Sequence, residues 1–208
     1  MSKKIKKGKF IVFEGIDGSG LSTQAQLLKN YLLGKVGDKT ILAKEPSEGP
    51  IGMVIRQFLS GRMTGPLGES LALLFAADRL DHNQNKIIPS IEQGNFVICD
   101  RYLWSSLAYQ GIENDMEWIK EINRYALKPD LTIFIKVRPE VSLKRIAHSR
   151  HQTELFEKKE TLEKVLANYI NIFKHSQDLG ENVVEINGEN LPEQVAQEVI
   201  KAVEENFF

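Results

Sequence analysis

The chain has 208 residues, of which 42% are hydrophobic and 26% are charged, the balance of a globular domain with a sizeable core. Its 27 Lys and Arg against 28 Asp and Glu residues leave a formal net charge of −1, which excludes a global basic field for nucleic-acid binding. No apolar run approaches the length of a membrane span. The single cysteine, Cys99, excludes an internal disulfide and fits the reducing cytoplasm. We expect a cytoplasmic protein with neither a nucleic-acid nor a membrane partner.

The stretch Phe10–Thr23 predicts a phosphate loop, because an apolar strand, a glycine-rich turn and the start of a helix follow one another. This is the context that the motif G-x-x-x-x-G-K-[ST] requires. Glycines let backbone N–H groups point at phosphate oxygens, and the helix adds its positive N-terminal end. The expected ATP phosphate-binding residues are Gly15, Asp17, Gly18, Ser19, Gly20, Leu21, Ser22 and Thr23. Ser22 stands where the motif places the hydroxyl that binds Mg²⁺.

Leu21 stands where the motif has a lysine, so the loop lacks a mobile positive charge for the β- and γ-phosphates. Two hypotheses stay open at this point. One is a working kinase site, and the other is a nucleotide-binding protein that has lost catalysis and serves as a sensor or partner subunit.

Apolar strands alternate with helices along the chain. We expect strands at Phe10–Phe13, Thr40–Ala43, Phe96–Cys99, Leu131–Val137 and Val183–Ile186. We expect helices at Leu21–Leu33, Pro50–Phe58, Glu69–Ile91, Ser105–Tyr109, Met116–Ala126, Pro139–Ala147 and Thr161–Leu179, and a last helix that begins after the N-cap Asn190. Pro89 is expected to tighten or kink the last turn of the helix Glu69–Ile91.

Continuous apolar strands separated by helices indicate a parallel sheet that is covered on both faces. The pattern predicts one α/β domain over residues 1–208, with a five-stranded parallel sheet and helices on both faces. Ligands of such a sheet bind at the carboxyl ends of the strands. The polar, irregular segment at about residues 148–159 is predicted to be a mobile lid.

Two polar groups follow strand ends. Asp100 can hold Mg²⁺, usually through water. The Arg101 beside it can bind a phosphate in a bidentate manner, through two guanidinium N–H groups. A structural ion pair between the two is the alternative. Lys44 ends the second strand and can pair with a second phosphate, although a lone lysine is more often a solvated surface group.

Phe75 and Arg79 are four residues apart on the long predicted helix, so they share one of its faces. A ring and a guanidinium placed in this way can stack on a base and bond to its edge, whereas periodicity alone would assign Phe75 to the core. Further hydroxyl and amide groups follow Arg101, namely Ser105, Ser106, Tyr109 and Gln110.

Together these motifs resemble those of the thymidylate kinase family. The matching runs are EGIDGSG-x-ST (Glu14–Thr23), KEP (Lys44–Pro46), LLFAADR (Leu73–Arg79), DRYLWSSLAYQG (Asp100–Gly111) and PDLTI (Pro129–Ile133). In order and spacing they cover nearly the whole chain, and the run that begins at Asp100 is far more specific than a phosphate loop alone.

The resemblance implies a Mg²⁺-dependent transfer of phosphate from ATP to dTMP by a homodimer that packs helices together. It implies dTMP contacts from Asp17, Lys44, Phe75, Arg79, Arg101, Ser106, Tyr109 and Gln110, with Phe75 stacked on thymine and Arg101 on the phosphate. It implies Mg²⁺ contacts from Ser22 and Asp100, and catalytic roles for Asp17, Arg101 and Arg150. Another acceptor, such as dUMP, stays open.

The lid departs from the family pattern, because Glu154–Glu157 reads ELFE where family members commonly have an arginine in second place. Both this change and Leu21 remove positive charge from the donor side. The replacement charges that the sequence offers are Arg150, Lys158, Lys159, Lys136 and Arg138, each of which is individually more probable as a solvated surface group.

Overall fold

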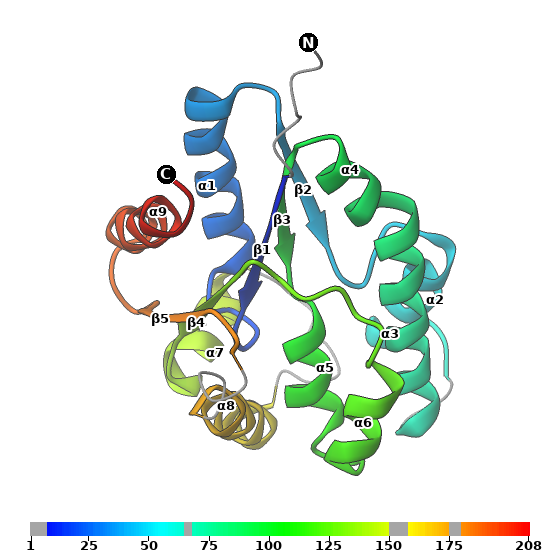
Figure 1. Ribbon diagram of the computed structural model, residues 1–208. Helices are drawn as coiled ribbons and strands as arrows, with labels where there is room; N and C mark the ends of the chain where they lie inside the picture. The colour runs from blue at the N-terminus through cyan, green and yellow to red at the C-terminus, as the bar shows by residue number, and fades with distance from the viewer. Residues whose placement is uncertain (1–7, 65–67, 150–157, 175–179) are drawn as a thin grey trace.

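A computed structural model describes residues 8–64, 68–149, 158–174 and 180–208 of the chain (Figure 1). Within these residues five strands form one sheet in the order β2-β3-β1-β4-β5, and every neighbouring pair is parallel. The strands are β1 (Lys9–Glu14), β2 (Thr40–Lys44), β3 (Phe96–Asp100), β4 (Leu131–Lys136) and β5 (Val183–Asn187). The predicted parallel sheet is therefore confirmed.

Both faces of the sheet are buried, as the unbroken apolar strands require. Ile11 and Phe13 of β1 pack toward α1 (Leu21–Val36) and α9 (Pro192–Phe207). The alternate residues of β1 pack in a second cluster on the opposite face, with buried residues from the long helical stretch. Figure 1 shows α1 and α9 on one side of the sheet, and the helices α3 (Glu69–His82), α4 (Ile88–Glu92) and α5 (Leu103–Gln110) on the other.

The long helical stretch between residues 69 and 92 is continuous but not regular. A π-helical turn, Asn83–Ile87, separates α3 from α4. Pro89 lies just beyond it and has no N–H to donate to the preceding turn, so the helix widens ahead of the proline. The expectation that Pro89 would tighten the last turn is thus wrong, because the irregularity is a wider turn upstream, and the expected kink stays a prediction.

Two helices are longer or shorter than predicted. α1 continues past Leu33 and Gly34 to Val36, and Gly37, whose φ is 71°, is its C-cap. One interior glycine costs only about 1 kcal/mol, which the packing of the buried Leu32 offsets. The helix α6 (Met116–Ile122) ends before Ala126, because the side-chain amide of Asn123 bonds to the carbonyl of Ile119 at 2.9 Å and competes with the helical backbone.

The remaining helices agree with prediction where the structure describes them. α2 (Pro50–Leu59) and α7 (Pro139–Ser149) fit the predicted ranges to within two residues, and α8 (Lys159–Lys174) begins two residues early, while its predicted end at Leu179 lies outside the described residues. The N-cap of α9 is Leu191, so the assignment of Asn190 to this position is wrong; Asn190 bonds instead to Glu198. Most of the predicted lid, with Arg150, lies outside the described residues. No helix in the described ranges combines the length and apolarity needed to cross a membrane.

Candidate active site

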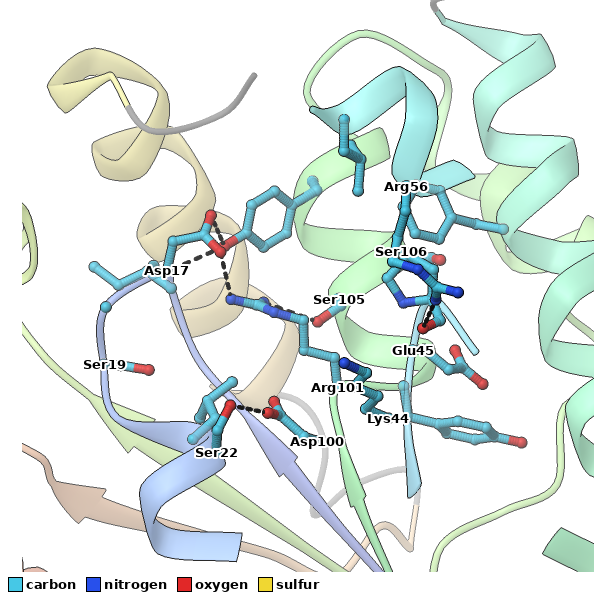
Figure 2. Close-up of a pocket in the computed structure, with 18 of the residues that line it drawn as sticks. Asp17, Ser19, Ser22, Lys44, Glu45, Arg56, Asp100, Arg101, Ser105 and Ser106 are labelled. Atoms are coloured by element: carbon cyan, nitrogen blue, oxygen red, sulfur yellow. Dashed lines mark hydrogen bonds and ion pairs between the residues drawn. The ribbon is translucent and has the colours of Figure 1, made fainter. Parts of the chain in front are cut away.

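A cavity of about 640 Å³ opens beside the carboxyl ends of β1, β2 and β3 (Figure 2). The phosphate loop forms one wall, the segment after β3 another, and α3 a third. The predicted site residues that line it are Asp17, Gly18, Ser19, Gly20, Leu21, Ser22, Thr23, Lys44, Phe75, Arg79, Asp100, Arg101, Ser106, Tyr109 and Gln110. Gly15 does not line the cavity, and Arg150 lies outside the described residues.

The phosphate loop needs its glycines for conformation and for space. Gly20 precedes α1 with a φ of 100°, in the left-handed region that favours glycine. A Cβ at Gly15 would come within 2.6 Å of the carbonyl oxygen of Ile135. From the other side, the hydroxyl of Ser142 on α7 donates to the carbonyl of Asp17. The loop therefore sits at the N-terminus of α1 in the shape of an anion cradle.

Ser19 provides a polar group inside the cradle. Its residue is 2% exposed, and its Oγ is buried without a hydrogen-bond partner in the part of the chain that the structure describes. Figure 2 shows the hydroxyl directed toward the cavity. A buried hydroxyl without a partner costs free energy, and a phosphate oxygen at this place would satisfy it.

Leu21 borders the cavity but belongs mainly to the core. It is 5% exposed and packs in the cluster that contains Ile11, Phe13 and Ala25. Its aliphatic chain therefore stabilises the packing of α1 on the sheet and contributes no charge to the loop.

Ser22 and Asp100 lie together below the loop, and the Ser22 hydroxyl donates to Asp100 Oδ2. Among the described residues no three or more His, Cys, Asp or Glu side chains form a metal-binding group. Mg²⁺ commonly takes one or two protein oxygens and completes its shell with phosphate oxygens and water. The Ser22–Asp100 pair fits that kind of site.

Arg101 is held in place by several contacts around the phosphate loop. Its guanidinium donates to Gly15 O at 2.9 Å and to Asp17 Oδ1 at 2.8 Å, and lies 5.1 Å from the ring centre of Tyr109. Burial raises the pKa of Tyr109 well above its usual value, so its hydroxyl stays protonated and donates to Asp17 Oδ2 at 2.9 Å. The three side chains form one preorganised corner, in which Asp17 balances the charge of Arg101 and fixes its guanidinium.

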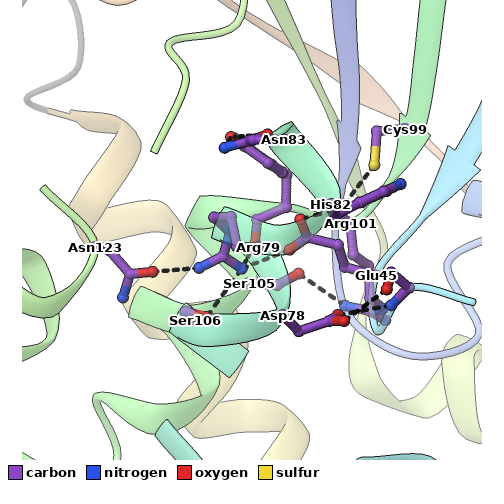
Figure 3. A network of polar contacts seen from close by, with 12 residues as sticks. Glu45, Asp78, Arg79, His82, Asn83, Cys99, Arg101, Ser105, Ser106 and Asn123 are labelled. Carbon is purple, nitrogen blue, oxygen red and sulfur yellow. Dashed lines mark hydrogen bonds and ion pairs between the residues drawn. The ribbon is translucent and has the colours of Figure 1, made fainter. Parts of the chain in front are cut away.

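A buried polar network supports the far end of the cavity (Figure 3). Arg79, which is 1% exposed, donates through Nη2 to Glu45 at 2.7 Å and to Ser106 at 3.1 Å, and through Nη1 to Asn123. Removing one partner of a buried ion pair typically costs about 3–5 kcal/mol. Arg79 Nε has no partner among the described residues, so one donor remains for a ligand.

Phe75 lies one turn before Arg79 on α3 and is half-buried. It lines the cavity and is absent from the buried core clusters, so the binding hypothesis fits its position better than the core assignment. The segment that carries Lys44 is anchored to the same helix, because Ser47 donates to Asp78 from its backbone N–H at 2.7 Å and from its hydroxyl at 2.6 Å. Lys44 itself is exposed at the cavity edge.

The replacement cations suggested by the sequence are mostly paired with carboxylates. Lys136 binds Glu185 at 2.9 Å on the neighbouring strand. The other two described pairs join Arg138 to Glu189 at 2.7 Å and Lys159 to Glu140 at 2.9 Å. Lys158 is exposed. None of these four lines the cavity.

Sequence reasoning missed two basic residues that line the cavity, Arg56 of α2 and Arg145 of α7. The guanidinium of Arg145 donates to Gly188 O at 2.8 Å and approaches Ser19 O at 3.4 Å. The sequence held no signal for Arg145, because only the structure shows that the face of α7 with Ser142 and Arg145 meets the loop.

The phosphate cradle and the corner that holds Arg101 thus line one cavity at the carboxyl edge of a parallel sheet. Two phosphate groups can meet there, one from each of two nucleotides. The fold and the site define a phosphate-loop nucleotide kinase. Among such kinases, the family model described as thymidylate kinase matches residues 13–199, and the chain belongs to the thymidylate kinase family.

Similar proteins cover almost the whole chain. A probable thymidylate kinase of Methanococcus aeolicus is 46% identical over 93% of this chain and 94% of its own length. A probable thymidylate kinase of Thermococcus gammatolerans is 36% identical over 97% of this chain and 98% of its own length. The solved thymidylate kinase of Candida albicans is 28% identical, with a TM-score of 0.82 over 96% of this chain and 92% of that one. The solved thymidylate kinase of Ehrlichia chaffeensis is 29% identical, with a TM-score of 0.74 over 96% of this chain and 100% of that one.

Proposed function

We propose that the chain transfers the γ-phosphoryl group of ATP to dTMP and gives ADP and dTDP. The observation that carries this proposal is that Arg101 and the phosphate loop line one cavity (Figure 2) together with Phe75 and Arg79. The matching kinases support the same reaction. The order of groups along the cavity suits a donor phosphate, an acceptor phosphate and an acceptor base.

The acceptor dTMP occupies the side formed by α3 and α5. Phe75 stacks on thymine, while Arg79 Nε, Ser106 and Gln110 bond to its edge. Gln110 Oε1 is buried without a described hydrogen-bond partner, which fits a group that waits for a base N–H. Tyr109 lies against the deoxyribose, and Arg101 and Lys44 bind the phosphate. Asp17 orients Arg101 through their 2.8 Å ion pair.

The donor ATP places its phosphates in the loop of residues 15–23. Ser19 Oγ and backbone N–H groups bond to phosphate oxygens, and Arg145 supplies the positive charge that the loop lacks at Leu21. Ser22 and Asp100 hold Mg²⁺, which when bound neutralises charge on the β- and γ-phosphates.

Catalysis rests on position and charge. The dTMP phosphate is already ionised, so no residue has to act as a general base. Arg101 on the acceptor side and Arg145 on the donor side stabilise the equatorial oxygens of a loose phosphoryl-transfer transition state. The lid at about residues 148–159, with Arg150, closes over ATP and excludes water, which limits hydrolysis.

The working form is a cytoplasmic homodimer that packs through α2 and α3. Exposed apolar side chains on these helices support this interface, because Met53 is 53%, Val54 40% and Leu73 50% exposed. A dimer would bury this apolar surface, which is otherwise unfavourable in water.

A coupled ADP-release assay with ATP, Mg²⁺ and a panel of monophosphates tests the function. We expect turnover with dTMP to exceed that with dUMP, UMP or GMP. A higher rate with dUMP would reassign the acceptor. Binding of dTMP without ADP release from any acceptor would favour the non-catalytic nucleotide-binding protein over the kinase.

A further inference from the structure

Glu14, the last residue of β1, is a buried carboxylate that does not line the cavity. Its exposure is 0%, and it lies directly before the phosphate loop. Oε1 accepts the backbone N–H groups of Tyr102 at 3.0 Å and Ser105 at 3.2 Å. Oε2 accepts the hydroxyls of Ser105 at 2.6 Å and Tyr169 at 2.8 Å. One carboxylate thus joins β1 to α5 and α8.

The contacts lead onward to Arg101. Its Nη1 donates to the Ser105 hydroxyl at 3.2 Å, as Figure 3 shows, and that hydroxyl donates to Glu14. The guanidinium therefore bonds directly to Asp17 and is connected to Glu14 through the hydroxyl of Ser105. The two backbone N–H groups and the two hydroxyls can all donate to an ionised carboxylate, and the hydroxyls also lie 2.8 Å from each other. Burial raises the pKa of Glu14, while the bonds from Ser105 and Tyr169 and the charge of Arg101 oppose that rise.

The backbone at Arg101 shows why such support is needed. Its φ is 68°, and it is the one residue other than glycine with a positive φ in the described chain. This conformation costs of order 1 kcal/mol and persists only where the surroundings determine it. The Arg101 N–H donates to Phe13 O at 2.9 Å, and the next N–H, that of Tyr102, donates to Glu14. Both bonds attach the turn to the end of β1.

Glu14 also stabilises the start of α5. The N-cap residue Tyr102 provides no side-chain cap, and the N–H of Ser105 in the first turn bonds to Glu14 instead. A negative charge at this end of a helix is favourable.

We propose that Glu14 is a positioning residue that orients Arg101 toward the acceptor phosphate by holding the turn of residues 100–102 and the Ser105 hydroxyl. This rests on the proposed function only in that the acceptor carries a phosphate that binds Arg101. Glu14 does not touch the nucleotide, so its effect depends on Arg101 and on the phosphate.

Calorimetry with dTMP and with thymidine, which lacks the phosphate, provides the test. In Glu14→Gln, which keeps the side-chain shape, we expect dTMP to bind about tenfold more weakly, while thymidine binding changes by less than about twofold. Asp130→Asn is the matched control, because Asp130 is a carboxylate that accepts a backbone N–H of β1 at the opposite end of the strand. We expect no change in either affinity for the control.

A double-mutant cycle identifies the route of the effect. If Glu14 acts through Arg101, Arg101→Ala should cost at least about threefold less dTMP affinity in the Glu14→Gln background than in the natural chain. Equal losses in the two backgrounds, or equal weakening of dTMP and thymidine, would overturn the proposal. Should Glu14→Gln fail to fold, Ser105→Ala breaks the same connection, and unchanged dTMP affinity in that variant would refute it. If dTMP does not bind the natural chain at all, the proposed function fails instead.

Discussion

The two sides of the cavity differ in how their charges are held. On the acceptor side, Arg101 and Arg79 are fixed by carboxylates within 2.8 Å and are largely or wholly buried. On the donor side, the loop has an uncharged Leu21, and the nearest described cation, Arg145, bonds to backbone carbonyls.

The difference suggests that the two nucleotides are bound by different means. In the proposed binding mode, the acceptor would meet side chains that are already in place and lose little conformational entropy on binding. The donor would meet backbone N–H groups, a buried hydroxyl and one arginine, so we expect its affinity to depend more on Mg²⁺ than that of the acceptor. The predictions below test this contrast.

The largest effect should come from Arg101→Ala. Removing a preorganised charged donor from a water-excluded site typically costs on the order of 10²–10³ in rate, and we expect kcat/KM for dTMP to fall by that factor. Steady-state kinetics with saturating ATP measures it. Arg124→Ala, which removes a surface arginine paired with Glu121, should leave the rate unchanged. A loss below about fivefold would mean that Arg101 is not the main acceptor-side cation.

Phe75→Ala should weaken the base end of the same side. Base–aromatic stacking is worth about 1–3 kcal/mol, so we expect dTMP affinity to drop by about tenfold or more while ATP affinity is retained. Calorimetry with each nucleotide separates the two. The control is Tyr125→Ala, since Tyr125 is an aromatic residue that is 69% exposed away from the cavity. Unchanged dTMP affinity in Phe75→Ala would remove this ring from the site.

Arg145→Ala tests the donor side. We expect the KM for ATP to rise by about five- to tenfold, the scale of one charge-assisted hydrogen bond, with no change in dTMP affinity. Arg138→Ala is the matched control on the same side, because its guanidinium already pairs with Glu189. If only Arg138→Ala raised the KM for ATP, the roles of the two arginines would have to be exchanged.

Leu21→Lys should have the smallest effect on rate. A lysine would restore the missing charge, but Leu21 packs in the core and Arg145 already lies beside the loop. We therefore expect kcat to rise by about tenfold or less, below the full value of a new donor. The melting temperature should fall, because a core methyl group is replaced by an ammonium. Leu21→Met, which keeps an apolar chain, should change neither. Abolished turnover in Leu21→Lys alone would show that the site depends on leucine here.

The fold could be predicted because its strands carry unbroken apolar runs such as Phe10–Phe13, and because glycines and prolines mark the turns. The helix ends were less predictable. The side-chain amide of Asn123 bonds to the Ile119 carbonyl where α6 ends, and the N-cap of α9 is Leu191 and not the expected Asn190. Both outcomes depend on competition between side chain and backbone, which residue type alone does not decide.

The candidate site could be predicted where a motif concentrates polar groups, as around Asp100 and Arg101. Arg145 was missed because no motif surrounds it and its significance lies in the contact of α7 with the loop. Glu14 drew no attention of its own because a charged residue at the end of a strand is ordinary until its burial and its four donors are known. Tertiary contacts make both residues functional candidates.

The strand order has a consequence for how the protein is made. β1, which leads into the phosphate loop, lies between β3 and β4, so Ile11 pairs with Ile98 and Leu131. A ribosome produces β1 first, but its two partners emerge only about ninety and about one hundred and twenty residues later. The phosphate loop therefore cannot reach its final structure until β3 and β4 have been synthesised. The apolar residues of β1 stay without their partner strands until then. Such non-local pairing slows folding, and it leaves the nascent chain prone to aggregation and accessible to chaperones.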